Sequence, residues 1–327
     1  YPEYSTDWLE AELNGSPFFP DKRPGDKFYY TQEDKDKILE CVDYWKGKSL
    51  YENLRKTLPE KINQAWDANV IDDTWVSAAG LGNVIVDYKG VVDKGLSDVM
   101  RRIENKLKRL DPREPGNTRK RWFLEAALQG NQAVVMFSGR IADCCKEQAE
   151  QEKDETRRRE LLKLEDICRN VPLNPARTFH EAVQSIYMIL LAVHLESNGH
   201  AISLGRFDQY VYPYYKRDLE EGRITREEAL EIVECFFIKC NELNKLRSWP
   251  DTEFFLGYQM FINLAIAGQT VDGKDATNEV SHLCVEACEN VRLFTPSVSI
   301  KWFEGTSDGF MMKALKAAQR HQGGQPA

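Results

Sequence analysis

The spacing of apolar residues predicts that most of the first half of the chain is helical. Apolar side chains recur every three or four positions, which places them on one face of a helix. The pattern is most regular from Asp87 to Asp111 and from about Lys120 to Glu150. Shorter helices are expected after Thr31 and after Ser49, because each is a good N-cap residue ahead of an apolar repeat.

The second half of the chain alternates between helical and extended patterns. Thr178–Glu181 and Thr225–Glu228 have the spacing of a capping box, and each precedes a helical repeat. The β-branched and aromatic run from Phe254 to Ala267 predicts a buried strand, and the alternation from Ser297 to Trp302 predicts another. Thr277 is the expected N-cap of a helix between them. The alternation predicts an α/β fold with strands inside and helices outside.

One stretch, from Glu196 to Tyr215, follows neither period. It begins where a long apolar helix reaches Ser197–Gly199, a sequence typical of a helix end. His200, Arg206, Asp208 and several aromatic residues then follow within a few positions. Because no regular period explains this density, we interpret the stretch as either a site or a buried polar junction. Arg206 with Asp208 is interpreted as a buried structural pair.

Composition narrows the classes of function that need consideration. A chain of 327 residues with 42% hydrophobic residues can build a large core, and the net charge of −8 argues against a nucleic-acid or anionic-membrane surface. No apolar run reaches the length of a membrane span. The eight cysteines contain no CxxC pair, so we expect buried free thiols in a reducing cytoplasm and no metal site. The chain starts at Tyr1 without a Met, and we expect a piece of a longer protein.

Four stretches taken together resemble one family. They are Gly82–Gly95, Glu196–Tyr215, Gly268–Glu279, and Pro296–Ile300 with the closing Gly324–Pro326. They resemble the glycyl radical enzymes of the pyruvate formate-lyase type, most closely the branch of glycerol and diol dehydratases that also includes choline and hydroxyproline lyases. Any one stretch alone would be weak evidence for the family. The order of the four stretches and the spacing between them also fit the family. The resemblance covers essentially the whole chain.

The resemblance implies a fold more specific than the α/β pattern. The family has a ten-stranded α/β barrel, made of two antiparallel five-stranded half-barrels and surrounded by helices. Residues 1–327 would be one pyruvate formate-lyase-like domain, incomplete at both ends. Residues 1–195 would supply mainly helical wrapping, and residues 196–327 the first half-barrel.

The resemblance also implies where the chemistry lies. In the family a cysteine on a central loop becomes a thiyl radical, and a glycyl radical near the C-terminus generates it. Both groups would lie beyond Ala327, so no catalytic residue is expected in this chain. In the family a glutamate often stands two residues after the radical cysteine. Cys284-Val285-Glu286 has this Cys-x-Glu spacing, but in the middle of a helix the two side chains would point to different sides. The resemblance further implies no directly bound cofactor, a radical-SAM iron-sulfur activating enzyme as partner, a homodimer and an anaerobic cytoplasm.

Matching motif to motif places several substrate-binding residues in this chain. They are Trp75, Asn83, His200, Ala201 and Phe261 (or its neighbour Tyr258). The glycerol dehydratase pattern has an amide where Trp75 stands and a hydroxyl where Ala201 stands. Glycerol is therefore a doubtful substrate, and one with an apolar portion fits better. Pyruvate fits worst, because the pyruvate cleavers have an arginine at the position of Asn83. His200 could instead be a satisfied buried imidazole, and Trp75 and Phe261 could be core aromatics.

These observations predict a glycyl radical lyase of the dehydratase type acting on a small hydroxylated molecule. Hydrogen abstraction beside a hydroxyl group would be followed by loss of a neighbouring group, with C–O cleavage favoured. Decarboxylation, radical addition and cleavage of C–N, C–S or C–C bonds remain alternatives. A non-enzymatic scaffold with this fold is the alternative from another class.

Overall fold

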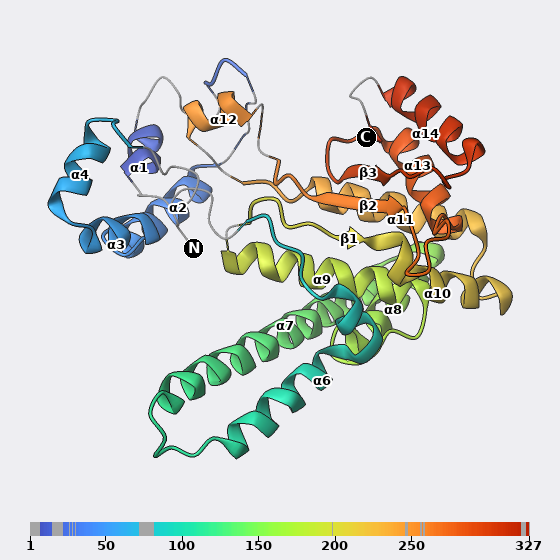
Figure 1. Cartoon of the computed structure of the whole chain (residues 1–327), viewed down its shortest axis with the longest axis horizontal. Coiled ribbons are helices and arrows are strands. Elements are labelled where there is room, and N and C mark those ends of the chain that lie inside the picture. Colours follow the sequence, from blue (N-terminus) through green and yellow to red (C-terminus); the bar gives the residue numbers. More distant parts are fainter. Residues whose placement is uncertain are drawn as a thin grey trace. The chain divides into compact units, whose positions relative to one another are not determined.

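The computed structural model describes residues 7–14, 22–25, 27, 29, 31–71, 82–197, 199–245, 248–255, 257, 259–321 and 325–326. The chain divides into two compact units (Figure 1). The first comprises residues 1–84, 193–203 and 241–262. The second comprises residues 85–192, 204–240 and 263–327.

The first unit is built from short helices. They are α1 (Asp7–Leu13), α2 (Gln32–Trp45), α3 (Leu50–Thr57), α4 (Glu60–Asp67) and α12 (Trp249–Phe255). Thr31 and Ser49 form complete capping boxes at the starts of α2 and α3, which confirms both predicted helix starts. A buried ion pair joins Arg23 to Glu12 at 2.7 Å, and Glu12 also accepts a hydrogen bond from the backbone N–H of Trp249 at 2.8 Å. This carboxylate therefore ties α1 to α12.

The second unit holds the longer helices and the sheet. The helices are α6 (Tyr88–Arg109), α7 (Asn117–Gln151), α8 (Glu155–Asn170), α9 (Phe179–Ser197, whose last turn belongs to the first unit), α10 (Phe207–Glu220), α11 (Arg226–Asn241), α13 (Glu279–Val291) and α14 (Asp308–His321). The strands are β1 (Gly205–Arg206), β2 (Asn263–Ala267) and β3 (Ser297–Lys301). The predicted helices from Asp87 and to about Glu150 are both confirmed.

The three strands form a parallel sheet in the order β1-β2-β3. Leu264 lies opposite Gly205 on one side and Val298 on the other. Leu264, Ile266 and Val298 are fully buried, and α10 and α13 pack against β2. The α/β class and the helical first half are thus confirmed, and the strands among the described residues all lie in the second half of the chain.

Two local predictions in the second half are wrong. The strand expected from Phe254 to Ala267 is limited to β2, because Phe254 lies in the helix α12 instead. The N-cap of α13 is Asn278 rather than Thr277, since the Asn278 side chain accepts from the N–H groups of Val280 and Ser281. Both errors arise where several residues of suitable type stand side by side, and tertiary packing chooses among them.

The predicted continuous helix from Asp87 contains a kink at Gly95. Gly95 has φ 72°, and a side chain there would clash with the backbone of Leu173 and Asn174. The N–H groups of Leu96 and Ser97 leave the helical ladder and donate instead to the carbonyls of Pro172 and Leu173, at 2.8 and 2.9 Å. The kink therefore fastens α6 to the segment that follows α8.

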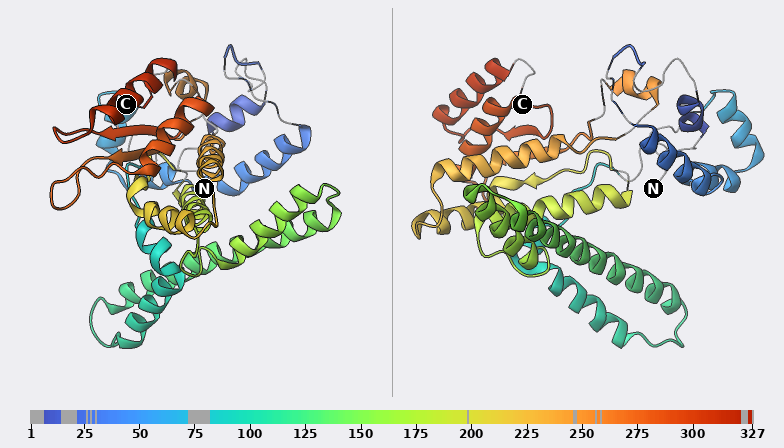
Figure 2. Two further views of the ribbon diagram at one scale, coloured as in Figure 1. Left: turned by 90° about the vertical axis from the view of Figure 1, so that its right-hand side faces the viewer. Right: turned by 180° about the vertical axis from the view of Figure 1, so that it is seen from behind.

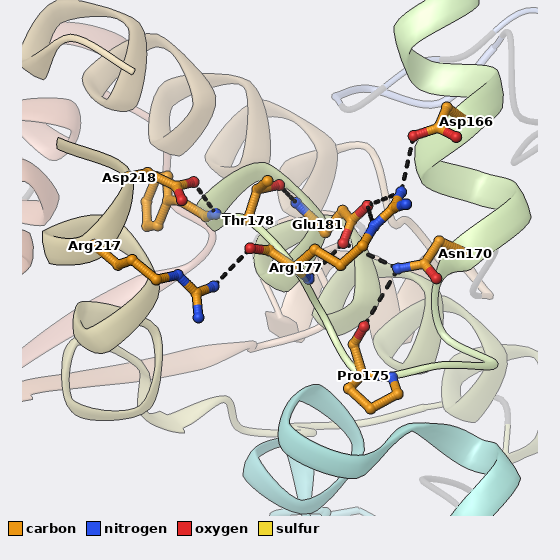
Figure 3. A network of polar contacts seen from close by, with 9 residues as sticks. Asp166, Asn170, Pro175, Arg177, Thr178, Glu181, Arg217 and Asp218 are labelled. Atoms are coloured by element: carbon orange, nitrogen blue, oxygen red, sulfur yellow. Dashed lines mark hydrogen bonds and ion pairs between the residues drawn. The ribbon is translucent and has the colours of Figure 1, made fainter. Parts of the chain in front are cut away.

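A network of charged side chains fixes the start of α9 (Figure 3). Thr178 caps the helix by accepting from the N–H of Glu181. The Glu181 carboxylate turns to Arg177, accepting from its backbone N–H at 2.5 Å and from its Nε at 2.8 Å. Arg177 also reaches Asp166 on α8, and its carbonyl accepts from Arg217 on α10. The network joins α8, α9 and α10.

Arg206 and Asp208 are structural, and both side chains bind the backbone at the end of β2. Arg206 donates to the carbonyls of Ala267 and Gln269, at 2.5 and 2.8 Å. Asp208 accepts from the N–H of Ala267 at 2.7 Å and from the Ser281 hydroxyl at 2.5 Å. Burial raises the pKa of Asp208, and these hydrogen bonds oppose the rise. The structural interpretation of both residues is confirmed, and the positive charge of Arg206 also lowers the pKa of Asp208.

The cysteines are not all buried as expected. Those on the core faces of their helices are buried, namely Cys145, Cys168, Cys240, Cys284 and Cys288, whereas Cys41, Cys144 and Cys235 are exposed. Among the helices that the structure describes, none combines the length and the apolar character needed to cross a membrane.

Candidate substrate site

Three extended segments of the first unit lie side by side and bring distant parts of the sequence together. The N–H of Asn83 donates to the carbonyl of His200 at 3.0 Å, and the N–H of Ser203 donates to the carbonyl of Val84 at 2.9 Å. On the other side of the middle segment, the N–H of Ala201 donates to the carbonyl of Met260 at 2.8 Å. Residues 82–84, 200–203 and 260–261 are therefore joined by backbone hydrogen bonds.

Three residues in these segments have a left-handed backbone. Asn83, Ala201 and Phe261 have φ of 56°, 54° and 55°. Asn tolerates this conformation, but for other residues with a side chain it costs on the order of 1–2 kcal/mol each. Such strain persists only where the surrounding structure imposes it, and it is concentrated at functional sites.

The approach of residues 82–83 to the middle segment depends on Gly82. A Cβ at this position would clash with the backbone carbonyl of His200. Gly199 makes a similar close approach, since a Cβ there would clash with the ring of His194 at the end of α9. Sequence reasoning did not single out Gly82, because a close approach between segments more than a hundred positions apart leaves no local pattern.

The side chains on the three segments combine polar and apolar groups. The imidazole of His200 lies against the ring of Phe261, with centroids 5.2 Å apart and planes 58° apart. The side chain of Asn83 is exposed and that of Ala201 is buried. An imidazole and a carboxamide can both donate to and accept from a hydroxyl group. The arrangement therefore offers polar groups beside an aromatic ring and a methyl group.

The structure brings together four of the five residues that the sequence predicted for the site. Asn83, His200, Ala201 and Phe261 lie on the three joined segments. Trp75 lies outside the described residues, as does Tyr258, the alternative to Phe261. Their shared role in substrate binding stays a prediction.

Cys284 is a buried core residue, as its mid-helix position predicted. It lies on α13 with no exposed surface, and burial raises the pKa of its thiol well above the usual value. Glu286 points to a different environment, where its carboxylate pairs with Arg226 at 2.6 Å and with Lys313 at 3.3 Å. The Cys-x-Glu motif at this position therefore does not place the carboxylate beside the thiol.

Comparison with known proteins gives a consistent result along the chain. The family model described as "Pyruvate formate lyase-like" matches residues 1–327. An isethionate sulfite-lyase of Nitratidesulfovibrio vulgaris is 32% identical over 99% of this chain and 40% of its own length. The chain thus spans about two fifths of the length of the curated relatives it matches.

Two solved structures have closely similar folds. One, from a study of 1,2-propanediol dehydration in Roseburia inulinivorans, has a TM-score of 0.90 and 39% identity, and covers 98% of this chain and 40% of that one. The other is a glycerol-bound, B12-independent glycerol dehydratase from Clostridium butyricum, with a TM-score of 0.90, 35% identity and the same coverage. With a family model matched along its full length, this chain belongs to the pyruvate formate lyase-like family.

Proposed function

We propose that this chain is the substrate-binding part of a glycyl radical lyase of the dehydratase type. The observation that carries the proposal is the backbone hydrogen bond from Asn83 to His200, which brings two predicted substrate-binding residues together from positions far apart in the sequence. The left-handed backbone of Asn83, Ala201 and Phe261 supports it, because such strain is typical of positions held for function.

The substrate is a small molecule with hydroxyl groups on neighbouring carbons. In the family's chemistry, a thiyl radical removes a hydrogen atom from a hydroxyl-bearing carbon. The neighbouring hydroxyl group then leaves as water with the proton of the remaining hydroxyl group, and the thiol returns a hydrogen atom to give the carbonyl product. The role of this chain is to hold the hydroxyl groups in position. His200 and Asn83 supply the polar contacts, while Phe261 limits how the imidazole ring can turn.

The apolar residues of the site favour a diol over glycerol. Ala201 supplies a methyl group where the glycerol dehydratase pattern has a hydroxyl, and Trp75 supplies an indole where that pattern has an amide. A third substrate hydroxyl would then lose its partners, which disfavours its binding. A methyl group in that place, as in 1,2-propanediol, fits better.

Cleavage of a sulfonate is less well supported, although a sulfite-lyase is among the relatives. A sulfonate calls for arginine side chains that bind its oxygens. Arg206 follows the predicted site residues His200 and Ala201 in the sequence, but its guanidinium donates to the carbonyls of Ala267 and Gln269.

The proposal extends to the whole protein. The three-stranded parallel sheet would form part of the first half of a ten-stranded barrel, with residues 1–195 as helical wrapping. The cysteine and glycine that carry the radicals would follow Ala327. A radical-SAM iron-sulfur enzyme would install the glycyl radical, no other cofactor would be bound, and the protein would work as a homodimer in an anaerobic cytoplasm.

The test is the substrate preference of the full-length, activated protein. We expect 1,2-propanediol to be dehydrated with a higher kcat/KM than glycerol. Ala201→Ser restores the hydroxyl and should raise the relative kcat/KM for glycerol about tenfold, the equivalent of one hydrogen bond. The substituted side chain is small enough to keep the local packing.

Asn83→Asp provides a second variant that keeps the side-chain size and tolerates the left-handed backbone. It should lower kcat/KM for diols while leaving the glycyl radical signal unchanged in electron paramagnetic resonance. Wild-type turnover of glycerol as fast as that of propanediol would contradict the assignment of Ala201. Full activity of Asn83→Asp would contradict the assignment of Asn83.

A further inference from the structure

A groove runs between α6 and the first half of α7, which lie side by side (Figures 1 and 2). It contains two adjoining cavities of about 390 and 380 Å³, which share three of their lining residues. The larger cavity lies where α6 ends and α7 begins, and its lining consists of Lys106, Arg109, Leu110, Lys120, Phe123 and Leu124. A cavity of this size can hold a small organic molecule.

The polar side chains that line the larger cavity are all cationic. Lys106 and Arg109 come from one turn of α6, and Lys120 comes from α7. None of the three forms an ion pair with a residue that the structure describes, although Lys120 donates to the side-chain oxygen of Asn117 at 3.1 Å. Several arginines elsewhere in the same unit do pair with carboxylates, namely Arg169, Arg177, Arg223 and Arg226. The cavity therefore concentrates positive charge that the described part of the chain leaves unbalanced.

The helix dipoles account for only part of this charge. Lys106 and Arg109 lie in the last turn of α6, where the dipole favours a cation. Lys120 lies at the start of α7, where the dipole disfavours one. Gly116, the N-cap of α7, makes no side-chain hydrogen bond to the first N–H groups of the helix. These groups therefore add to the positive potential beside Lys120, and a helix start of this kind favours a bound anion.

The remainder of the chain limits which anions can bind here. From Arg101 to Arg121 nine residues are Lys or Arg and three are Asp or Glu, whereas the whole chain has a net charge of −8. A long polyanion such as DNA or RNA would be repelled by the acidic remainder of the chain. A compact anion that fits between α6 and α7 avoids most of this repulsion. It also meets an aromatic surface, because Phe123 lines the cavity with 73% of its surface exposed.

We propose that the cavity between α6 and α7 binds a nucleoside di- or triphosphate. The phosphate groups accept charge-assisted hydrogen bonds from Lys106, Arg109 and Lys120, and their negative charge balances the three cations. The nucleobase stacks on the ring of Phe123. A single phosphate or carboxylate group would leave this ring exposed and part of the positive charge unbalanced. None of these residues belongs to the segments of the candidate substrate site, so nucleotide binding is a further function of the chain.

The test is isothermal titration calorimetry of the full-length protein with ATP, tripolyphosphate and adenosine, in the absence of divalent metal ions. We expect ATP to bind about tenfold more tightly than tripolyphosphate, because a base gains about this factor by stacking on an aromatic side chain. Adenosine, which lacks the phosphate groups, should show no measurable binding. Added salt should weaken the binding of ATP and of tripolyphosphate.

Two variants separate the phosphate contacts from the base contact. Lys106→Gln with Lys120→Gln should weaken the binding of ATP and of tripolyphosphate alike, by at least about tenfold. Phe123→Ala should weaken ATP binding about tenfold and leave tripolyphosphate binding unchanged. Arg140→Gln with Lys146→Gln is the matched control, since it removes two exposed cations from α7 outside the cavity. It should bind ATP like the wild type, and equal melting temperatures without ligand show that all the variants fold.

These measurements need no glycyl radical, so their outcome is independent of the proposed lyase activity. A wild type that binds no ATP at millimolar concentration would overturn the proposal, and another segment of the full-length chain or an acidic protein would then cover the groove. Equal losses in the cavity variant and the control would also overturn it, because binding would then follow net charge alone. Equal affinities for ATP and tripolyphosphate would overturn the assignment of the base to Phe123.

Discussion

The imidazole of His180, on the first turn of α9, makes the second unit sensitive to acid. Burial, together with the positive charge of Lys163, lowers its pKa to about 4, and the charge of Glu181 opposes this change. Its Nδ1 is buried without a hydrogen-bond partner. The folded protein therefore keeps this ring neutral at pH values where an unfolded chain would protonate it.

The expected result is a loss of stability between about pH 6.5 and pH 4. Within this window the unfolded chain binds a proton that the folded chain does not, so the free energy of unfolding decreases as the pH falls. The shift corresponds to at most about 3.5 kcal/mol. Thermal melts of the full-length protein should show His180→Gln losing less stability than the wild type across this window. Equal losses in the two proteins would contradict the assignment to His180.

At the level of single residues, the sequence was informative where chemistry is local. Thr31 and Ser49 cap helices through residues three positions away, and both were predicted. The left-handed backbone of Ala201 and Phe261 was not, because it is imposed by hydrogen bonds between segments distant in the sequence. Asn83 and His200 were chosen by resemblance alone, and nothing in the local sequence predicts that their backbones meet.

Single helices and strands were predicted better than their irregularities. The apolar repeat identified α6 and α7, yet it predicted one smooth helix through Gly95. A glycine inside a repeat reads equally as a weak helix residue or as a kink. At Gly95 the backbone of Leu173 and Asn174 decides in favour of the kink, because it occupies the position that a side chain would need.

Replacing this glycine tests how strongly the stability of the protein depends on the kink. Gly95→Ala would impose a left-handed backbone on an alanine and a clash with the Leu173 carbonyl, so it should destabilise the protein by about 2 kcal/mol or more. Gly139→Ala is the matched control within a regular helix, since a Cβ there meets no neighbouring atom. It should stabilise the protein by about 0.5–1 kcal/mol. Urea unfolding of both variants measures the difference, and effects of the same sign would contradict the account of Gly95.

For the whole molecule, the match along the full chain shows family membership, whereas the activity is a proposal. The chain spans about two fifths of its relatives, and the described residues contain three parallel strands. Periodicity predicted an α/β class but could not predict how many strands complete the sheet, because closure depends on partners for the edge strands. The ten-stranded barrel was a consequence of the resemblance only.

The location of the radical chemistry can be tested through the cysteines of this chain. Cys284 is buried on α13 beside Leu283 and Ala287, and its neighbour Glu286 is committed to Arg226. A thiol that exchanges hydrogen with a substrate must reach it, which this burial prevents. Cys284→Ala in the full-length, activated protein should therefore keep both the glycyl radical signal and turnover close to wild type. Cys288→Ala, one turn further along the same buried face, controls for the loss of packing. If Cys284→Ala alone abolished turnover while both variants folded and carried the glycyl radical, the radical would pass through this chain, and the proposed division between substrate binding here and radical chemistry elsewhere would be wrong.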